Sequence, residues 1–399
     1  MSDWVEKDLG TILRLNYGWS LPEKKRVVGE VPVYGSNGVV GSHNKALVAS
    51  PGLIVGRKGS AGNVHYSQTP FCPIDTTFYI TPNDATVDIE FLYYLLTHLD
   101  LKRILGDVGV PGLNREIAYK EKTRLPEDRD EQRKIAVVLG LVRRAVEQQE
   151  RLIAVTTELK KTLLHKLFTG GLRGEPQKQT EIGPMPESWE QRPLEEAGDV
   201  IYGIQAAVAS NLKPIGMKIL TNKNITLDGK IVLDSINYFV LKTKRHQQTV
   251  LKKGDLLFNW RSGSKEHVGK TAYFDLDGEF THSSFILRIR PTNEVTGKYL
   301  FYYLNFLRGS GYFVKSQTFS VNAKFNKSAI NRLPTYLPED HERSEIVTTL
   351  DAVTRKIEVV ETRKRLLEDL FRTLLHQLMT AQIRVHDLDL PELEATGTE

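Results

Sequence analysis

Hydrophobic residues recur at alternating steps of four and three along two stretches of the chain, 127–172 and 339–385. This is the a/d spacing of a coiled coil, and it continues over more than four heptads in each stretch. Gln149, Thr156 and Lys160 interrupt the first seam, and Lys364 interrupts the second. The pattern predicts two long helices that pack on each other; the alternative is that each helix covers an unrelated core. The regular seam positions are Ile135, Leu139, Val142, Val146, Leu163 and Leu167 in the first stretch and Ile346, Leu350, Val353, Ile357, Leu374 and Leu378 in the second.

The two stretches are also related in sequence. Leu163–Arg173 reads LLHKLFTGGLR and Leu374–Arg384 reads LLHQLMTAQIR, with matching residues 211 positions apart. Nearer the N-terminus, Trp4 returns as Trp189, 185 positions later. A repeat of this length indicates two large modules rather than a solenoid of short units.

The segments ahead of the helices, 1–126 and 188–338, are rich in glycine and in β-forming residues, which predicts short strands joined by glycine turns. Each also contains an apolar run typical of a short buried helix, Phe91–Leu99 and Tyr299–Leu307. The predicted class is α+β: two β-rich domains separated by a long antiparallel coiled-coil helix pair, with an internal pseudo-two-fold repeat. The predicted parts are a first β-rich domain (1–126), a central helix (127–172), a linker (173–187), a second β-rich domain (188–338), a distal helix (339–385) and a C-terminal tail (386–399).

The linker predicts the orientation of the two helices. Residues 173–187 are polar and include three prolines. Each helix would be roughly 60 Å long at 1.5 Å per residue, and a parallel pair would have to carry the chain back along this length, which is close to the extended reach of the linker. Antiparallel packing places the end of the first helix beside the start of the second, so we predict that arrangement.

Composition restricts the setting more than the function. The single Cys72 cannot form an internal disulfide, which fits a reducing cytoplasm. The chain has no run of 18 apolar residues and no apolar signal region at its N-terminus, so a cytoplasmic location is expected. The net charge of +5 permits an anionic partner without requiring one.

Two glycine-flanked loops carry side chains that suit contacts with DNA. RKGSAGN (Arg57–Asn63) follows one apolar run, and RSGSKEH (Arg261–His267) follows another. Such cations, hydroxyls and amides can contact phosphates and hydrogen-bond to base edges. The segment 242–270 carries eight Lys or Arg residues against two Asp or Glu, although a solvated basic loop without a ligand is the alternative. The candidate DNA-binding residues are Ser36, Asn37, Arg57, Lys58, Ser60, Asn63, Asn259, Arg261, Ser262, Lys265, His267 and Lys270, with the two arginines as the principal contacts.

Motifs for catalysis are missing, so no catalytic residues, metal site or bound cofactor are expected in this chain. Gly263–Thr271 (GSKEHVGKT) comes near to a P-loop but has five residues between its glycines, where the motif needs four. No HExxH, GxSxG or paired-cysteine motif occurs, and no Asn-Pro-Pro-aromatic motif of an adenine methyltransferase.

Taken together, these segments resemble the specificity (S) subunit of type I restriction–modification systems, over nearly the whole chain. None of the matching segments is a strict signature, but their order and duplication make the match specific. The second helix departs from the first at HERSE (His341–Glu345), where the first has EQR (Glu131–Arg133). The matching segments are YGSNGVVG (Tyr34–Gly41), GRKGSAGNV (Gly56–Val64), PGLN (Pro111–Asn114), LPEDRDEQRKI (Leu125–Ile135), LLHKLFTGGLRG (Leu163–Gly174), GPMPESW (Gly183–Trp189) and GDLLFNWRSGSKEHVGKT (Gly254–Thr271).

The resemblance implies that each β-rich domain is a target-recognition domain that reads one half of a bipartite site in double-stranded DNA. It further implies that the helix pair sets the spacing and docks two methyltransferase (M) subunits, joined by motor–nuclease (R) subunits. S-adenosylmethionine, ATP and Mg would then be bound by those partners, and methylation would be of adenine. The alternatives are a non-catalytic coiled-coil scaffold with two protein-binding heads, which the basic segment disfavours, and an enzyme acting on DNA alone, which the missing motifs disfavour.

Overall fold

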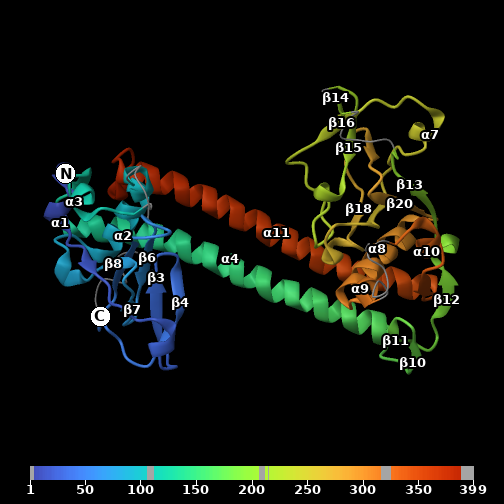
Figure 1. Cartoon of the computed structure of the whole chain (residues 1–399), viewed down its shortest axis with the longest axis horizontal. Helices are drawn as coiled ribbons and strands as arrows, with labels where there is room; N and C mark the ends of the chain where they lie inside the picture. Colours follow the sequence, from blue (N-terminus) through green and yellow to red (C-terminus); the bar gives the residue numbers. More distant parts are fainter. Residues whose placement is uncertain (1–3, 106–111, 206–211, 214, 316–324, 388–399) are drawn as a thin grey trace. The chain divides into compact units, whose positions relative to one another are not determined.

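The computed structural model describes residues 4–105, 112–205, 212–213, 215–315 and 325–387 (Figure 1). It divides into two compact units, which we call unit 1 (Met1–Arg151 with Glu361–Glu399) and unit 2 (Leu152–Val360). Each unit contains one β-rich module and a part of each of the two long helices. Pro111 of the predicted PGLN turn and residues 388–399 of the predicted tail lie outside the described residues.

Unit 1 contains three small sheets around a short helix. Their strand orders are β2-β8-β5-β6, β4-β3-β7 and β1-β9, and every pairing is antiparallel except β3 with β7. The elements are β1 (Trp4–Asp8), α1 (Leu9–Ile12), β2 (Asn16–Tyr17), η1 (Glu23–Lys25), β3 (Val31–Gly35), β4 (Gly38–His43), β5 (Gly52–Gly56), β6 (Val64–Ser67), β7 (Cys72–Pro73), β8 (Thr77–Ile80), η2 (Pro82–Asp84), α2 (Ile89–Leu99), η3 (Leu101–Ile104), α3 (Arg115–Tyr119), β9 (Lys122–Pro126), the start of α4 (Arg129–Gly170), the end of α11 (Asp340–Met379) and η6 (Val385–Asp387).

Unit 2 repeats this plan with a larger second sheet. Its sheets have the orders β13-β20-β17-β18, β14-β16-β15-β19 and β12-β21, with a separate hairpin β10-β11. The parallel pair β15–β19 matches β3–β7, and β12–β21 matches β1–β9. The elements are β10 (Gln177–Thr180), β11 (Gly183–Pro186), β12 (Glu190–Pro193), α5 (Leu194–Ala197), β13 (Gly198–Tyr202), β14 (Leu212–Lys213), β15 (Met217–Leu220), η4 (Asn222–Asn224), β16 (Asn237–Phe239), α7 (Lys244–Gln247), β17 (Leu256–Asn259), η5 (Lys265–His267), β18 (Thr271–Tyr273), β19 (Phe280–His282), β20 (Ile286–Pro291), α8 (Glu294–Gly309), α9 (Tyr312–Lys315), α10 (Lys327–Asn331) and β21 (Pro334–Leu337), besides the end of α4 and the start of α11.

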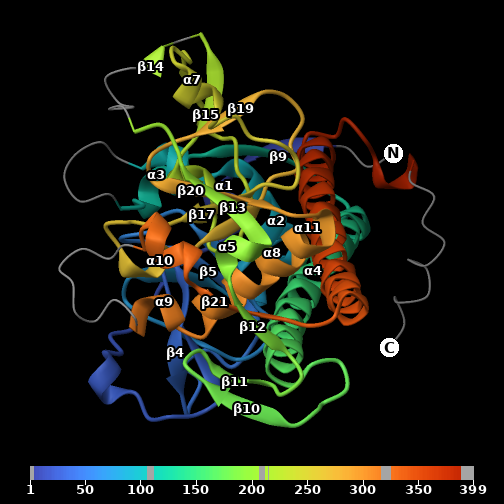
Figure 2. The same ribbon diagram turned by 90° about the vertical axis from the view of Figure 1, so that its right-hand side faces the viewer.

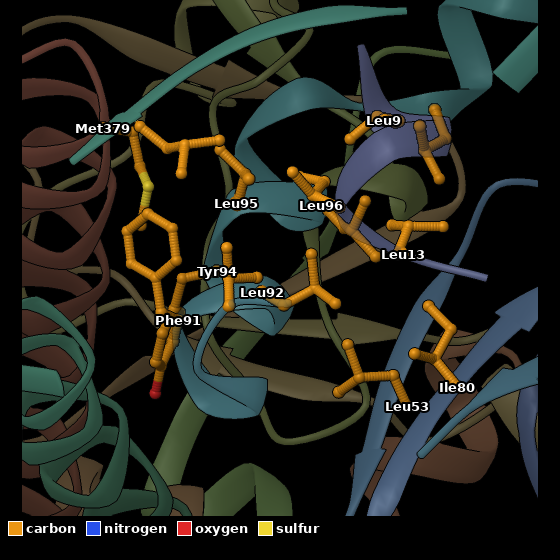
Figure 3. Packing of buried hydrophobic residues seen from close by; sticks show 14 of the residues in the cluster. Leu9, Leu13, Leu53, Ile80, Phe91, Leu92, Tyr94, Leu95, Leu96 and Met379 are labelled. Carbon is orange, nitrogen blue, oxygen red and sulfur yellow. The ribbon is translucent and has the colours of Figure 1, made fainter. Parts of the chain in front are cut away.

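The long helices run antiparallel within each unit. In unit 1 the start of α4, at Ile135 and Leu139, shares a core with Leu378 and Met379 at the end of α11. Figure 3 shows Met379 beside the side chains of α2 in this core. In unit 2 the end of α4 shares a core with the start of α11, through Leu167, Phe168, Ile346 and Leu350. The predicted class is therefore confirmed: α+β, an internal repeat and an antiparallel pair of long helices.

The seam residues and their interruptions have specific surroundings. All the regular seam positions are buried or half-buried. Among the interruptions, Lys364 forms an ion pair with Glu150 of the other helix, with 3.1 Å between Nζ and Oε1. The Thr156 hydroxyl donates a hydrogen bond to the carbonyl of Leu152 in its own helix, at 2.6 Å. The polar groups of Lys364 and Thr156 are thus paired, whereas the side-chain oxygen of Gln149 is buried without a hydrogen-bond partner.

The segment predicted as a linker has a fold of its own. Residues 177–186 form the hairpin β10–β11, which lies beside the end of α4 (Figure 2). Ile182 and Met185 are buried in the core of unit 2, and Lys178 donates hydrogen bonds to the carbonyls of Glu187 and Trp189. A polar composition with three prolines suggested an open connection, but two apolar side chains are enough to hold this hairpin on the core.

Candidate nucleic-acid interface

The two predicted loops leave equivalent strands and are closed by the same backbone bonds. In unit 1 the loop after β5 is closed by Gly62 N–H to Gly56 O and Gly56 N–H to Asn63 O, both 2.8 Å. In unit 2 the loop after β17 is closed by Gly269 N–H to Asn259 O (2.9 Å) and Asn259 N–H to Lys270 O (2.8 Å). Gly62 and Gly269 have φ of 81° and 87°, a conformation that favours glycine. The loop of unit 2 is the longer one, spanning residues 260–268 against 57–61.

Arg57 lies in a stack of aromatic and cationic side chains in unit 1. Its guanidinium is 4.9 Å from the ring centroid of Tyr17, and Nη1 donates to the carbonyl of Asp75 at 3.1 Å. Arg115, the first residue of α3, lies 5.2 Å from the same ring. Tyr17 is 49% exposed, so this arrangement presents two cations and an aromatic ring at the surface.

Arg261 is held similarly in unit 2. Its guanidinium lies 4.9 Å from the ring of Trp260 and 4.3 Å from the ring of Phe285, and Nη2 donates to the Ser284 hydroxyl at 3.2 Å. Tyr202, at the end of β13, packs edge-on against Trp260 with centroids 5.4 Å apart.

The two arginines differ by one position in their backbone register. Arg57 N–H donates to Thr76 O, and the corresponding bond in unit 2 runs from Trp260 N–H to Phe285 O. Arg261 is therefore one residue further along its loop than Arg57. Each guanidinium group nevertheless hydrogen-bonds to the equivalent turn of its own unit, at Asp75 in unit 1 and at Ser284 in unit 2.

The other predicted residues of unit 1 are divided between surface and support. Asn37 and Lys58 are exposed, in the turn between β3 and β4 and in the loop after β5. Ser60 and Asn63 are half-buried. Ser36 is buried and donates its hydroxyl to Thr76 O at 2.6 Å, so it supports the turn that Arg57 contacts.

In unit 2, two of the predicted residues are buried and bind backbone carbonyls. Lys270 is 4% exposed and donates from Nζ to the carbonyls of Asn222 (2.9 Å) and Ile225 (2.6 Å). Burial lowers the pKa of the Lys270 ammonium. Asn259 is fully buried and its Nδ2 donates to His267 O at 2.6 Å. The direct DNA contacts predicted for both residues are at odds with this burial, because the Lys270 ammonium binds carbonyls of residues 222 and 225 and the Asn259 amide nitrogen binds the loop carbonyl of His267.

The remaining predicted residues lie on the loop itself. Lys265 is exposed, and Ser262 and His267 are half-buried. The basic segment 242–270 does not form one patch: Lys253 pairs with Asp277 at 2.7 Å and Lys270 is buried, whereas Lys244 and Arg245 are exposed on α7.

Sequence reasoning missed several residues of this surface, namely Tyr17, Arg115, Phe285 and Lys327. One signal was available, because Asn114-Arg115 recurs as Asn326-Lys327. The asparagine of each pair caps the short helix that follows, α3 or α10. The backbone N–H of Lys327 donates to the Tyr202 hydroxyl at 3.0 Å, which places this lysine next to Tyr202 as Arg115 lies next to Tyr17.

The described residues offer neither a metal-binding group nor a membrane-spanning helix. No group of three or more His, Cys, Asp or Glu side chains among them could hold a metal ion. None of the helices in the described part of the chain is both long enough and apolar enough to cross a membrane.

Comparisons with known proteins identify the family. A model described as the type I restriction modification DNA specificity domain matches residues 1–157 and 186–369. The type I restriction enzyme MjaVIII specificity subunit of Methanocaldococcus jannaschii is 25% identical over 327 residues, covering 79% of this chain and 75% of that protein. The putative MjaX specificity subunit of the same organism is 30% identical over 200 residues, covering 47% of this chain and 46% of that protein.

Solved structures show the same fold. The S subunit of a type I restriction–modification system from M. genitalium has a TM-score of 0.64 at 14% identity, covering 95% of this chain and 96% of that one. A chain of a second structure, which concerns complex assembly and conformational transition of the type I R-M system, has a TM-score of 0.54 at 16% identity. The match covers 94% of this chain and 97% of that one. With a family match that spans both modules and most of each long helix, this chain belongs to the type I restriction–modification DNA specificity family.

Proposed function

We propose that this specificity subunit reads a bipartite site in double-stranded DNA, with one half-site bound by each β-rich module. The observation that carries this proposal is the duplicated arginine loop. Arg57 and Arg261 lie in the loops that follow equivalent strands, and each stacks on an aromatic ring. Each also hydrogen-bonds to the equivalent turn of its own unit, although the two loops differ in length and sequence. Arginine held in this way suits bidentate contacts with guanine in the major groove.

The residues around each arginine complete the proposed interface. Exposed or half-buried residues would face DNA: Asn37, Lys58, Ser60, Asn63 and Arg115 in unit 1, and Ser262, Lys265, His267, Phe285 and Lys327 in unit 2. Ser36, Asn259 and Lys270 would act indirectly, by holding the loops and turns in place. The proposed target-recognition domains are residues 1–126 and 188–338.

The long helices supply the proposed docking surface for two methyltransferase subunits. Several apolar side chains on them are exposed, notably Val155 and Leu159 on α4 and Leu366 and Leu370 on α11. Exposed apolar side chains on long helices are suited to partner proteins. Motor–nuclease subunits would join the same complex in the cytoplasm, and S-adenosylmethionine, ATP and Mg would be bound by the partners. The chain itself would be non-catalytic.

The test is methylome sequencing of cells that carry the methyltransferase subunit, with and without an intact copy of this chain. We expect one bipartite adenine-methylated motif that depends on the chain. Replacing residues 1–126 with the module of a relative should change one half of the motif only. A motif unaffected by loss of the chain, together with duplex DNA binding that does not depend on salt, would instead favour the protein-binding scaffold.

A further inference from the structure

Phe285 is an exposed aromatic residue on a turn that is unusually well anchored. The turn joins β19 to β20, and 41% of the Phe285 side chain is exposed. Single exposed apolar residues are common and need no special role. The distinguishing feature here is the number of polar groups that hold this one in place.

Four hydrogen bonds fix the backbone of the turn, and a fifth fixes a side chain. Ile286 N–H donates to Ser283 O (3.0 Å), and Ser283 N–H donates to Leu220 O (2.9 Å). Trp260 donates its backbone N–H to Phe285 O (3.3 Å) and its indole Nε1 to Ser284 O (2.7 Å). Arg261 then binds the Ser284 hydroxyl at 3.2 Å. Phe285 is therefore held in one place without being buried.

The contact with Arg261 limits what the ring can do. The guanidinium lies 4.3 Å from the ring centroid and so covers one face of Phe285. Insertion between base pairs as a wedge requires both faces of a ring, so this role is disfavoured. A ring edge beside an arginine can instead contact an apolar group on a base edge while the arginine donates hydrogen bonds nearby. The only apolar group that an unmodified base presents in the major groove is the C5-methyl of thymine.

The corresponding residue of unit 1 is different. Thr76 accepts from Arg57 N–H (2.8 Å) as Phe285 accepts from Trp260 N–H, but Thr76 is half-buried and short. The two modules therefore present different side chains at equivalent positions, threonine in unit 1 and phenylalanine in unit 2. Such a difference is consistent with the reading of different bases.

We propose that Phe285 is a specificity-determining residue that contacts a thymine methyl group in the half-site read by unit 2. This inference rests on the proposed DNA-reading function and names one of its contacts. Loss of the methyl group should weaken binding, because that apolar surface would no longer be removed from water.

The experiment uses the full chain in complex with its methyltransferase subunit and duplexes that carry the motif found by methylome sequencing. Each thymine of the half-site read by unit 2 is replaced singly by uracil, which removes only the methyl group. At one position we expect binding to weaken about fourfold, the effect of one buried methyl group. Phe285→Ala should weaken binding to the thymine duplex and abolish the response to uracil, whereas Phe285→Leu should retain the response.

Controls separate this inference from the proposed function. Thr76→Ala should leave the uracil response of the unit 2 half-site unchanged, and the folding of Phe285→Ala is checked by its normal binding to the other half-site. If the wild-type complex binds its motif specifically but tolerates uracil at every position, or the half-site has no A·T pair, the Phe285 inference is wrong and the function stands. An unchanged uracil response in Phe285→Ala has the same meaning. If the complex shows no sequence preference at all, the proposed function is wrong.

Discussion

The indole of Trp189 donates a hydrogen bond to the carboxylate of Glu342, with 3.3 Å between Nε1 and Oε2. Trp4 makes the same bond to Glu131 in unit 1, also at 3.3 Å. In each unit the carboxylate also binds the segment that follows the other long helix: Glu342 accepts from Leu172 N–H (3.0 Å), and Glu131 pairs with Arg384 (3.0 Å). One glutamate in the first turn of each helix thus ties a β-rich module to both helices. HERSE, the departure from the first repeat, preserves this glutamate.

We expect Glu342→Ala to destabilise unit 2 by about 1–3 kcal/mol, because the indole and the Leu172 amide would lose their acceptor. Thermal unfolding measures the loss, and hydrogen exchange should locate it at β12 and β21. Glu345→Ala is the matched control, since Glu345 lies in the same helical turn and forms an ion pair with the exposed His341. Equal effects of both substitutions would contradict the role of Glu342.

Arg57→Ala and Arg261→Ala should each relax one base position, in separate half-sites, at a cost of about 1–3 kcal/mol in binding. Selection of bound sites from a random library measures the preference. Arg→Lys at the same positions should not restore it, since lysine lacks the planar pair of donors. A loss spread evenly over all sequences would instead identify a phosphate contact.

Arg115→Ala should weaken DNA binding without changing the preferred sequence. Arg115 stacks on Tyr17 beside Arg57, where a second cation can neutralise a phosphate. The slope of log K against log salt concentration should then decrease in magnitude by about 1. Lys122→Ala, which removes an exposed lysine paired with Glu6 at 3.0 Å, is the control and should leave the slope unchanged.

The stability of unit 2 should fall in mild acid because of His282. Its imidazole is completely buried, which lowers its pKa to about 3, and Nδ1 lies 3.0 Å from Thr249 O. The unfolded chain binds the proton near pH 6.5 whereas the folded chain does not, so stability is lost as the pH falls below about 6.5. The loss from this group should reach about 2 kcal/mol at pH 5.

Denaturant unfolding of His282→Asn between pH 7 and pH 5 tests this prediction. The unfolding free energy should fall less steeply with decreasing pH than in the wild type, whatever the stability of the variant at neutral pH. His341→Gln, which changes a histidine on the surface, should keep the wild-type slope. Parallel curves for His282→Asn and wild type would exclude His282 as the cause.

Lengthening both long helices should change the preferred spacing of the half-sites. The ion pair between Glu150 and Lys364 marks positions at the same level of the two helices. Inserting seven residues next to each preserves the heptad pattern and adds about 10 Å, or roughly three base pairs of spacer. Those pairs also rotate one half-site by about 100°, so affinity can fall while the preferred spacing grows. Selection of bound sites from a library with variable spacers measures the preferred spacing. Tight binding that keeps the wild-type spacing would show that the helices do not set the distance between the half-sites.

The sequence alone was sufficient for the long helices, their orientation and the repeat. Those features depend on periodicity and chain connectivity, which are visible in one dimension. Ile135, Leu139, Ile346 and Leu350 are spaced for a seam, and all four are buried. The arginine loops were also visible in the sequence, because a cation that follows an apolar strand and lies within two residues of a glycine is a local pattern.

Only the tertiary structure decided which polar residues in and beside those loops are buried against the protein backbone and which are exposed to solvent. Lys270 and Lys265 look alike in sequence, but Lys270 meets two carbonyls from residues 222 and 225, far away along the chain. The one-residue shift between Arg57 and Trp260 depends on hydrogen bonds to a separate turn, and so does the fixed position of Phe285. The hairpin 177–186 likewise depends on the space that unit 2 leaves for Ile182 and Met185. Such contacts join residues distant in sequence, and periodicity carries no information about them.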